Sequence, residues 1–320
     1  MNAISDISIP VGISACLLGQ KVRFDGGHKR SPYCLNVLSE CFEFKPFCPE
    51  VAAGLGTPRQ PIRLVGNAED PRALGTRDPS MDVTDGLAEH ADFVTRNHPE
   101  LCGYILMKGS PSCGMERVKV YHPNGNPNEA GSGIFAARLM QNNPALPVEE
   151  EGRLNDAVLR ENFITRVFVY YSWREEVCSD PSLHNMIQFH SRHKYQLMAH
   201  TYAGYKELGR FLAQKAPSMA LEEAMDYYIL NLMGFLKQKA NRKSHTNVLM
   251  HIMGYMKKDL DKETKSDLLA AIEDYRTKKV HLVVPLSLMK HYLKRHGNDY
   301  ILSQAYLDPY PHELGLRNYI

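Results

Sequence analysis

The sequence has no long hydrophobic run and no recognisable export signal. A membrane-spanning helix needs roughly 18 to 20 apolar residues in succession, and no segment reaches that length. The first residues also lack the basic segment, apolar core and small-residue cleavage site of a signal peptide. Internal repeats and low-complexity tracts are missing as well. These absences predict a cytoplasmic protein with no membrane partner.

Disulfide frameworks are also disfavoured. The chain has 7 cysteines, an odd number, and their spacing is irregular. Without an export signal, such cysteines are expected to be reduced thiols or metal ligands.

The net charge is only +2, but its distribution is uneven. Residues 180–320 contain 20 Lys and Arg against 14 Asp and Glu, which leaves 18 and 22 for residues 1–179. The excess in the second part is compatible with an anionic partner such as nucleic acid, although a solvated helical surface produces similar counts. A length of 320 residues favours two domains.

Alternating strand and helix patterns occupy the first part of the chain. Buried strands are predicted at residues 7–14, 42–47 and 103–108, and helices at residues 82–97, 131–142 and 154–177. This alternation predicts a Rossmann-like α/β domain with a mostly parallel sheet.

From about residue 185 the strand patterns stop and successive helical patterns follow, separated by Pro, Ser or Gly. The polar segment SDPSLHN, residues 179–185, has the composition of a boundary. We therefore predict an α/β domain over residues 1–178 and an all-α domain over residues 179–320.

Three cysteines share one position: Cys16, Cys48 and Cys113 each follow a predicted strand. In an open α/β sheet the loops beyond the carboxyl ends of the strands converge on one edge, where ligands bind. Three thiolates without a histidine fit an iron–sulfur cluster better than structural zinc, which takes four ligands in closely spaced pairs. Small buried hydrophobic side chains remain an alternative interpretation of the same cysteines, and so does zinc.

Four segments of the first part resemble the signature motifs of the thiouracil desulfurase (TudS) family: SACLLGQKVRFDGGHKR, FCPEVAAGLGTPR, MKGSPSCG and EEEGRLNDAVLRENFITRVF. The resemblance implies a 4Fe-4S cluster held by Cys16, Cys48 and Cys113, with an open fourth iron that accepts sulfur from a thiolated pyrimidine. Segments of the second part, such as FHSRHKYQLMAHTYAGYKELGR, resemble the helical domain of two-domain relatives known as RudS. That resemblance implies removal of sulfur from 4-thiouridine in tRNA, without net redox change.

The motifs also suggest residues for the reaction. Glu50, two residues after Cys48, is placed to act as the general base that activates water. Ser112 and Ser110 flank Cys113, and either hydroxyl is a candidate for holding the substrate or relaying a proton. Ser14 and Asp25 are candidates for the pocket wall, although a turn or backbone hydrogen bond is the favoured interpretation of both residues.

Basic residues provide candidate RNA contacts. We expect phosphate contacts from a first set near the sheet edge, comprising Lys29, Arg30 and Arg59. In the helical part, bases interleave with aromatic residues in the way expected of an RNA surface, and the candidates are Arg192, Lys194, Lys206 and Arg210. The aromatic residues between them also follow helical spacing and so fit plain core packing.

Two other functions fit the same sequence. One is a desulfurase of free thiouracil or another thiolated nucleobase. The other is a non-catalytic iron–sulfur sensor that binds RNA or protein through its helices; the open iron and Glu50 argue against it. No DNA partner is expected, and the sequence does not predict the oligomeric state.

Overall fold

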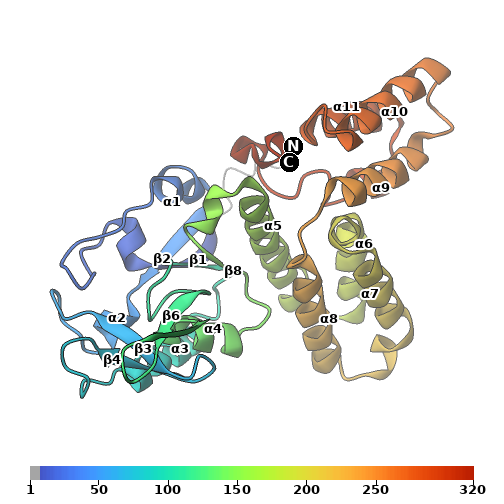
Figure 1. The fold of residues 1–320 in the computed structure, drawn as a ribbon. Coiled ribbons are helices and arrows are strands. Elements are labelled where there is room, and N and C mark those ends of the chain that lie inside the picture. Colours follow the sequence, from blue (N-terminus) through green and yellow to red (C-terminus); the bar gives the residue numbers. More distant parts are fainter. Residues whose placement is uncertain (1–7) are drawn as a thin grey trace. The chain divides into compact units, whose positions relative to one another are not determined.

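The structure is a computed structural model that describes residues 8–320. The chain forms two compact units, Met1–Asn155 and Asp156–Ile320 (Figure 1). We predicted the boundary between residues 178 and 179. The difference arises from α5 (Ala157–Trp173), which packs against α8 (Leu221–Leu236) of the helical unit. The fold class, an α/β region followed by an all-helical region, is confirmed.

The first unit contains a parallel sheet in the strand order β2-β1-β5-β8. Its strands are β1 (Ile9–Ser14), β2 (Phe42–Phe47), β5 (Tyr104–Leu106) and β8 (Val148–Glu150). The first three agree with the predicted strands. Because all four run in the same direction, their carboxyl ends lie at one edge of the sheet.

Close packing between β1 and β5 depends on one glycine. Gly12 pairs with Tyr104 in the parallel register, and the tyrosine ring lies directly over it. A Cβ atom at residue 12 would lie 2.3 Å from Tyr104 Cδ2, which is far inside van der Waals contact. Glycine is therefore required at this position.

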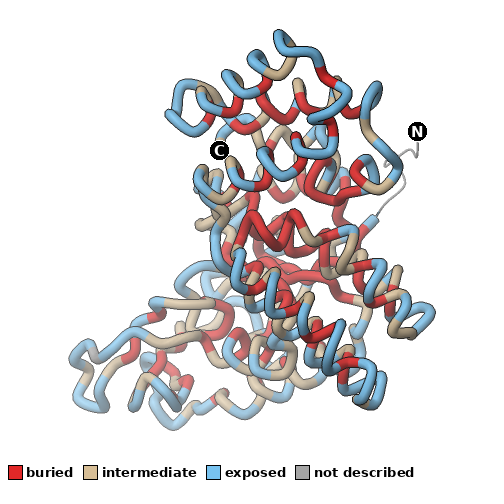
Figure 2. Tube along the Cα trace, turned by 90° about the vertical axis from the view of Figure 1, so that its right-hand side faces the viewer, coloured by how far each residue is buried: buried red, intermediate tan, exposed pale blue. Residues whose placement is uncertain are grey.

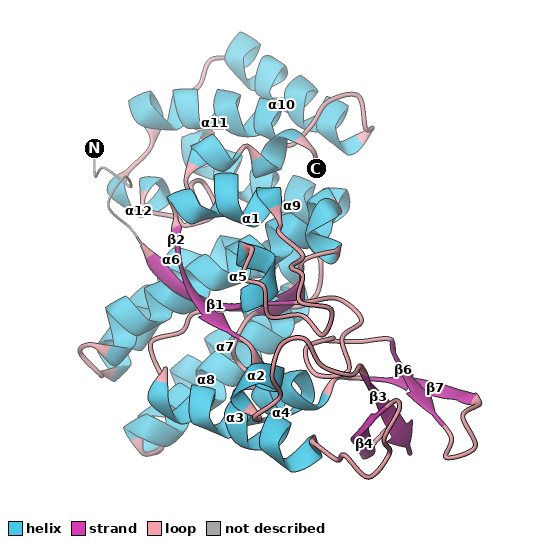
Figure 3. Cartoon of the chain, turned by 90° about the vertical axis from the view of Figure 1, so that its left-hand side faces the viewer, coloured by secondary structure: helices cyan, strands magenta, loops and turns pink. Residues whose placement is uncertain are grey.

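A second, mixed sheet was not predicted from the sequence. Its order is β4-β3-β6-β7, with β3 parallel to β6 and both outer pairs antiparallel. The strands are β3 (Ile62–Gly66), β4 (Pro71–Gly75), β6 (Val118–Tyr121) and β7 (Pro127–Gly131). Figure 3 shows these strands in magenta, together with those of the first sheet.

Helices of the first unit are α1 (Pro32–Asn36), α2 (Pro49–Ala52), α3 (Thr84–Asn97) and α4 (Ile134–Asn142). The longer two, α3 and α4, pack against each other. Both also meet the parallel sheet, since His90 of α3 contacts Phe47, and Phe135 of α4 contacts Tyr104. These two helices therefore cover one face of that sheet.

Helices make up the regular structure of the second unit. In addition to α5 and α8 they are α6 (Leu183–His200), α7 (Tyr202–Gln214), α9 (Arg242–Met253), α10 (Lys262–Arg276), α11 (Val283–His296) and α12 (Asp299–Leu302). Side-chain caps start several of them: Asp156 caps α5, Ser182 caps α6, and Asn241 forms a capping box on α9.

Amphipathic packing holds the helical unit together. Buried and exposed residues alternate along its helices, as the colours of Figure 2 show. One aromatic cluster joins three helices, because Trp173 of α5 contacts both Phe189 of α6 and Tyr228 of α8 with ring centroids 5.2 Å apart. Among residues 8–320, no helix has both the length and the apolar character that crossing a membrane requires.

Candidate active site

Three cysteines line a single cavity of about 240 Å³ at the carboxyl edge of the parallel sheet. Cys16 lies in the short turn after β1, Cys48 directly follows β2, and Cys113 lies in the loop after β5. The structure thus brings together the three residues that the strand-end argument selected. The remaining cysteines do not line this cavity; they are Cys34, Cys41, Cys102 and Cys178.

Burial controls the protonation of the three thiols. It raises the pKa of Cys16 to about 11 and is also the main cause of the raised pKa values of Cys48 and Cys113. A hydrogen bond from Ser14 acts in the opposite direction on Cys113, whereas the charge of Glu50 raises its pKa further. The free thiols therefore carry their protons at neutral pH, and a metal centre would have to displace them.

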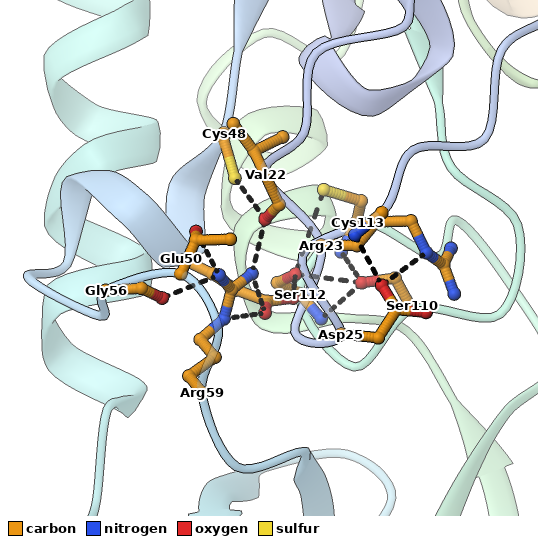
Figure 4. A network of polar contacts seen from close by, with 12 residues as sticks. Val22, Arg23, Asp25, Cys48, Glu50, Gly56, Arg59, Ser110, Ser112 and Cys113 are labelled. Atoms are coloured by element: carbon orange, nitrogen blue, oxygen red, sulfur yellow. Dashed lines mark hydrogen bonds and ion pairs between the residues drawn. The ribbon is translucent and has the colours of Figure 1, made fainter.

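Glu50 belongs to a hydrogen-bond network that also includes Cys48 and Cys113 (Figure 4). Its Oε1 atom accepts a 2.7 Å hydrogen bond from Ser112 Oγ. Its Oε2 atom accepts hydrogen bonds from Arg59 Nε at 2.9 Å and from Arg59 Nη2 at 2.6 Å. Only 15% of the Glu50 side chain is exposed, so the carboxylate is largely screened from bulk water.

The two serines occupy different positions in this network. Ser110 Oγ accepts hydrogen bonds from the backbone N–H groups of Ser112 and Cys113, which shapes the turn. The Ser110 and Ser112 hydroxyls lie 2.9 Å apart. Since Ser112 donates to Glu50, Ser110 is left to donate to Ser112, and a chain of hydroxyls leads to the carboxylate. Ser112 is the serine that contacts Glu50 directly.

Of the two predicted pocket residues, only one lines the cavity. Ser14 Oγ accepts a 3.0 Å hydrogen bond from the Met107 N–H and lies at the cavity wall. Asp25 is outside the lining, and its Oδ1 accepts a 2.9 Å hydrogen bond from the Gly27 N–H. Asp25 instead lines an adjoining cavity, which shares Phe24, Arg59 and Pro61 with the cysteine cavity, so its role as a pocket residue stays a prediction.

The prediction that Arg59 contacts RNA phosphate is also wrong. Its side chain is only 6% exposed and forms an ion pair with Glu50 inside the site. All five N–H donors of the guanidinium face protein oxygens, so none is available for phosphate. By contrast, Lys29 and Arg30 are exposed on the loop that follows Cys16.

The basic candidates of the helical unit lie on α6 and α7. Lys206 and Arg210 are exposed, whereas Arg192 forms an ion pair with Glu176 and remains half exposed. The ammonium group of Lys194 lies 4.9 Å from the centre of the Tyr195 ring. Phosphate contacts by these residues stay predictions, as do those of Lys29 and Arg30.

Several cavity residues were not identified from the sequence. They include Val22, Phe24, Phe47, Met107 and Lys108. All five lie within the motifs that resemble the thiouracil desulfurase family, and the position of Met107 and Lys108 immediately before the Cys113 loop could have identified these two. No local pattern indicates that the Val22 carbonyl points at Arg59, because that contact joins residues 37 positions apart.

Comparisons with known proteins follow the same division of the chain. Residues 11–151 match the family described as 2-thiouracil desulfurase, and residues 194–311 match a family described as protein of unknown function DUF1722. The uncharacterized protein YbgA of Escherichia coli K12 is 32% identical over 133 residues, which are 42% of this chain and 79% of YbgA. The chain belongs to the 2-thiouracil desulfurase family.

Two further relatives each cover a little less than half of the chain. The uncharacterized protein YbbK of Bacillus subtilis 168 is 31% identical over 150 residues, which are 45% of this chain and 97% of YbbK. A solved structure, that of the 4Fe-4S-dependent thiouracil desulfidase TudS, is 32% identical with a TM-score of 0.37. It covers 47% of this chain and 94% of its own. In this chain the family match of residues 11–151 contains all three cavity cysteines as well as Glu50 and Ser112.

Proposed function

We propose that this protein is an iron–sulfur-dependent desulfurase that converts 4-thiouridine in tRNA to uridine. One observation carries the proposal: three cysteines from separate strand ends share a cavity with a carboxylate that is hydrogen-bonded to a serine. Membership of the 2-thiouracil desulfurase family supports the reaction class.

The donor set fits a cluster better than a single ion. Among residues 8–320, no three His, Cys, Asp or Glu side chains converge closely enough to hold one metal ion. Cys16, Cys48 and Cys113 instead lie among the residues that line a cavity of about 240 Å³. We assign them as the three ligands of a 4Fe-4S cluster, which leaves one iron without a protein ligand. When bound, such a cluster supplies a Lewis acid for a soft sulfur atom.

The protein residues supply the acid–base chemistry. Hydrolysis of the thiocarbonyl takes up one water, forms a carbon–oxygen bond, breaks the carbon–sulfur bond and releases sulfide without oxidation or reduction. Glu50 accepts a proton from the attacking water, because its carboxylate lines the same cavity as the three cysteines. Ser112, hydrogen-bonded to Oε1, passes protons between that carboxylate and the substrate.

RNA docking is assigned to the helical unit. Residues 180–320 carry an excess of 6 positive charges, counted as 20 Lys and Arg minus 14 Asp and Glu. On α7, Lys206 and Arg210 are exposed, and the 47%-exposed ring of Tyr202 lies 4.7 Å from the Lys206 ammonium. An exposed aromatic ring beside cations suits both base stacking and phosphate contact. The neighbouring residues Phe189 and Leu208 are buried and serve as core.

Metal analysis and turnover test the proposal together. Anaerobically purified wild-type protein is expected to contain about four irons and to lose them in the Cys16→Ala, Cys48→Ala and Cys113→Ala variants. Cys34→Ala is the control, because Cys34 is buried in the same unit but outside the cavity. Stoichiometric zinc, or full iron in any of the three variants, would contradict the cluster assignment.

Substrate choice requires a separate measurement. Turnover of 4-thiouridine-containing tRNA should exceed that of free 2-thiouracil, and the double variant Lys206→Glu/Arg210→Glu should lower only the tRNA reaction. If free thiouracil is turned over faster than tRNA and the double variant changes neither rate, the protein is a nucleobase desulfurase. If an iron-loaded protein turns over neither compound, the catalytic proposal fails.

A further inference from the structure

Arg59 makes a fully satisfied set of hydrogen bonds inside the active-site wall. Besides the two bonds to Glu50, Arg59 Nη2 donates to the Val22 carbonyl at 2.8 Å. Arg59 Nη1 donates to the Gly56 carbonyl at 3.0 Å and to Thr57 Oγ1 at 3.2 Å. An arginine that uses every donor in one rigid fork has a single orientation.

This arrangement assigns a different partner to each oxygen of the Glu50 carboxylate. Arg59 occupies Oε2 through two charge-assisted hydrogen bonds, and Ser112 occupies Oε1. The carboxylate therefore cannot rotate without breaking bonds on both sides. Oε1 is held on the side of Ser112 and the thiols, where a proton has to be accepted.

The same guanidinium connects the two segments that carry cysteines. The Val22 carbonyl, which accepts from Arg59, also accepts a weak 3.9 Å hydrogen bond from Cys48 Sγ. The Arg59 backbone N–H donates to the Phe24 carbonyl at 2.9 Å. Residues 22–24 follow the Cys16 turn, so Arg59 joins that segment to the one containing Cys48 and Glu50.

We propose that Arg59 is a positioning residue that fixes the Glu50 carboxylate for proton transfer and holds the adjacent cavity wall in place. The proposal rests on the function assigned above to Glu50. Arg59 itself contacts the catalytic carboxylate and is not expected to bind the substrate. Its removal should therefore lower kcat and leave KM nearly unchanged, since a misplacement of about 1 Å at a catalytic group costs on the order of 10²-fold in rate.

Three variants separate charge from geometry. Arg59→Met removes both and should lower kcat on the order of 10²-fold. Arg59→Lys keeps the positive charge but not the planar fork, so its kcat should lie between those of Arg59→Met and wild type. Arg59→Ala should regain activity when guanidinium is added at low millimolar concentration. Arg138→Met is the matched control, because Arg138 makes a two-pronged pair with Asp92 at a distance from the cavity lining.

Hydrogen exchange of the cluster-free protein provides a measurement that does not depend on activity. Peptides covering residues 20–26 and 48–56 should lose protection in Arg59→Lys, and those peptides should be unchanged in Arg138→Met. Unchanged protection in Arg59→Lys would overturn the inference even if Arg59→Met failed to fold. If the wild type is active, a kcat within about threefold of the wild-type value in both Arg59→Met and Arg59→Lys would also overturn the inference.

The two proposals fail in different ways. An iron-loaded wild-type protein without turnover removes the desulfurase function, while the exchange pattern still decides whether Arg59 holds the wall. The positioning role alone is removed if the wild type is active, guanidinium does not rescue Arg59→Ala, and the Arg59 variants raise KM without lowering kcat.

Discussion

Replacing Glu50 by Gln tests the assigned base with the smallest change in shape. The carboxylate accepts from Ser112 through Oε1 and from Arg59 through Oε2. Glutamine offers one acceptor oxygen and one NH₂ donor. The oxygen should face Arg59, because hydrogen bonds from a charged donor are the stronger ones. The NH₂ group then faces Ser112, whose hydroxyl has to accept where it formerly donated.

The expected effect on the rate follows from the loss of a positioned base. General acid–base catalysis contributes about 10² to 10⁴ in rate, which corresponds to about 2.7 to 5.4 kcal/mol of activation free energy. Stability should fall too, because the 6%-exposed Arg59 side chain loses its counterion. Breaking a buried ion pair costs about 3 to 5 kcal/mol. We expect a value near the lower end of this range, because three other oxygens still accept hydrogen bonds from the Arg59 guanidinium.

The assay compares wild type and Glu50→Gln after anaerobic reconstitution to equal iron content. Turnover is measured as loss of the near-ultraviolet absorbance of the thiocarbonyl, and the visible absorbance of the cluster reports its integrity. Glu43→Gln is the control, because 52% of the Glu43 side chain is exposed and it pairs only with Lys45 on the surface. A Glu50→Gln rate within about tenfold of wild type, at matched iron, would refute the role of Glu50 as base.

Three further predictions concern stability. Gly12→Ala should cost at least about 1 to 3 kcal/mol of unfolding free energy, since its Cβ would overlap the Tyr104 ring, and denaturant unfolding measures the loss. Asp92→Asn should cost about 1 kcal/mol at pH 7; hydrogen bonds from Arg138 lower the pKa of Asp92, so this difference should vanish as pH falls through the lowered pKa. Burial lowers the pKa of His193 to about 3. Protonation of this histidine should therefore lower the free energy of unfolding of the helical unit by about 1.4 kcal/mol per pH unit as the pH falls from roughly 6 to 3. Trp173 fluorescence measures the unfolding.

Controls make these predictions specific. Gly56→Ala should be nearly neutral, because no heavy atom lies within 4 Å of a Cβ built there. The loss of stability in Asp92→Asn should be visible at pH 7 as faster hydrogen exchange in α3 and α4. The same substitution should have no such effect in an Arg138→Met background. His193→Gln should reduce the acid slope by one proton, whereas His312→Gln, with 87% of the side chain exposed, should leave it unchanged. Equal slopes in all three proteins would contradict the assignment to His193.

Local patterns explain which parts of the site could be predicted. The apolar runs ending at Ser14, Phe47 and Leu106 are strands, and each is followed within seven residues by a cavity cysteine. Parallel strands place their carboxyl ends at one edge, so strand prediction and cysteine position together sufficed to gather the thiols. Glu50 followed from its closeness to Cys48 in the chain.

Long-range pairing explains what escaped prediction. The second sheet joins Leu64 to Val120, and its short strands carry charged residues that weaken the apolar pattern. The unit boundary differs from the predicted one because residues 161–169 of α5 are all buried, and a helix without a clear exposed face fits a sheet-covering helix and a bundle helix equally well.

The sequence by itself determined the class of each region, three strands of the parallel sheet and the three cysteines after those strands, because these depend on periodicity and neighbours along the chain. Only the tertiary structure decided where the polar side chains point. Arg59 looks like any surface arginine in its motif, but the fold buries it against Glu50, and the fold joins Ser112 to a carboxylate 62 residues away. Hydrogen-bond partners are set by the packing of distant segments, which no local pattern encodes.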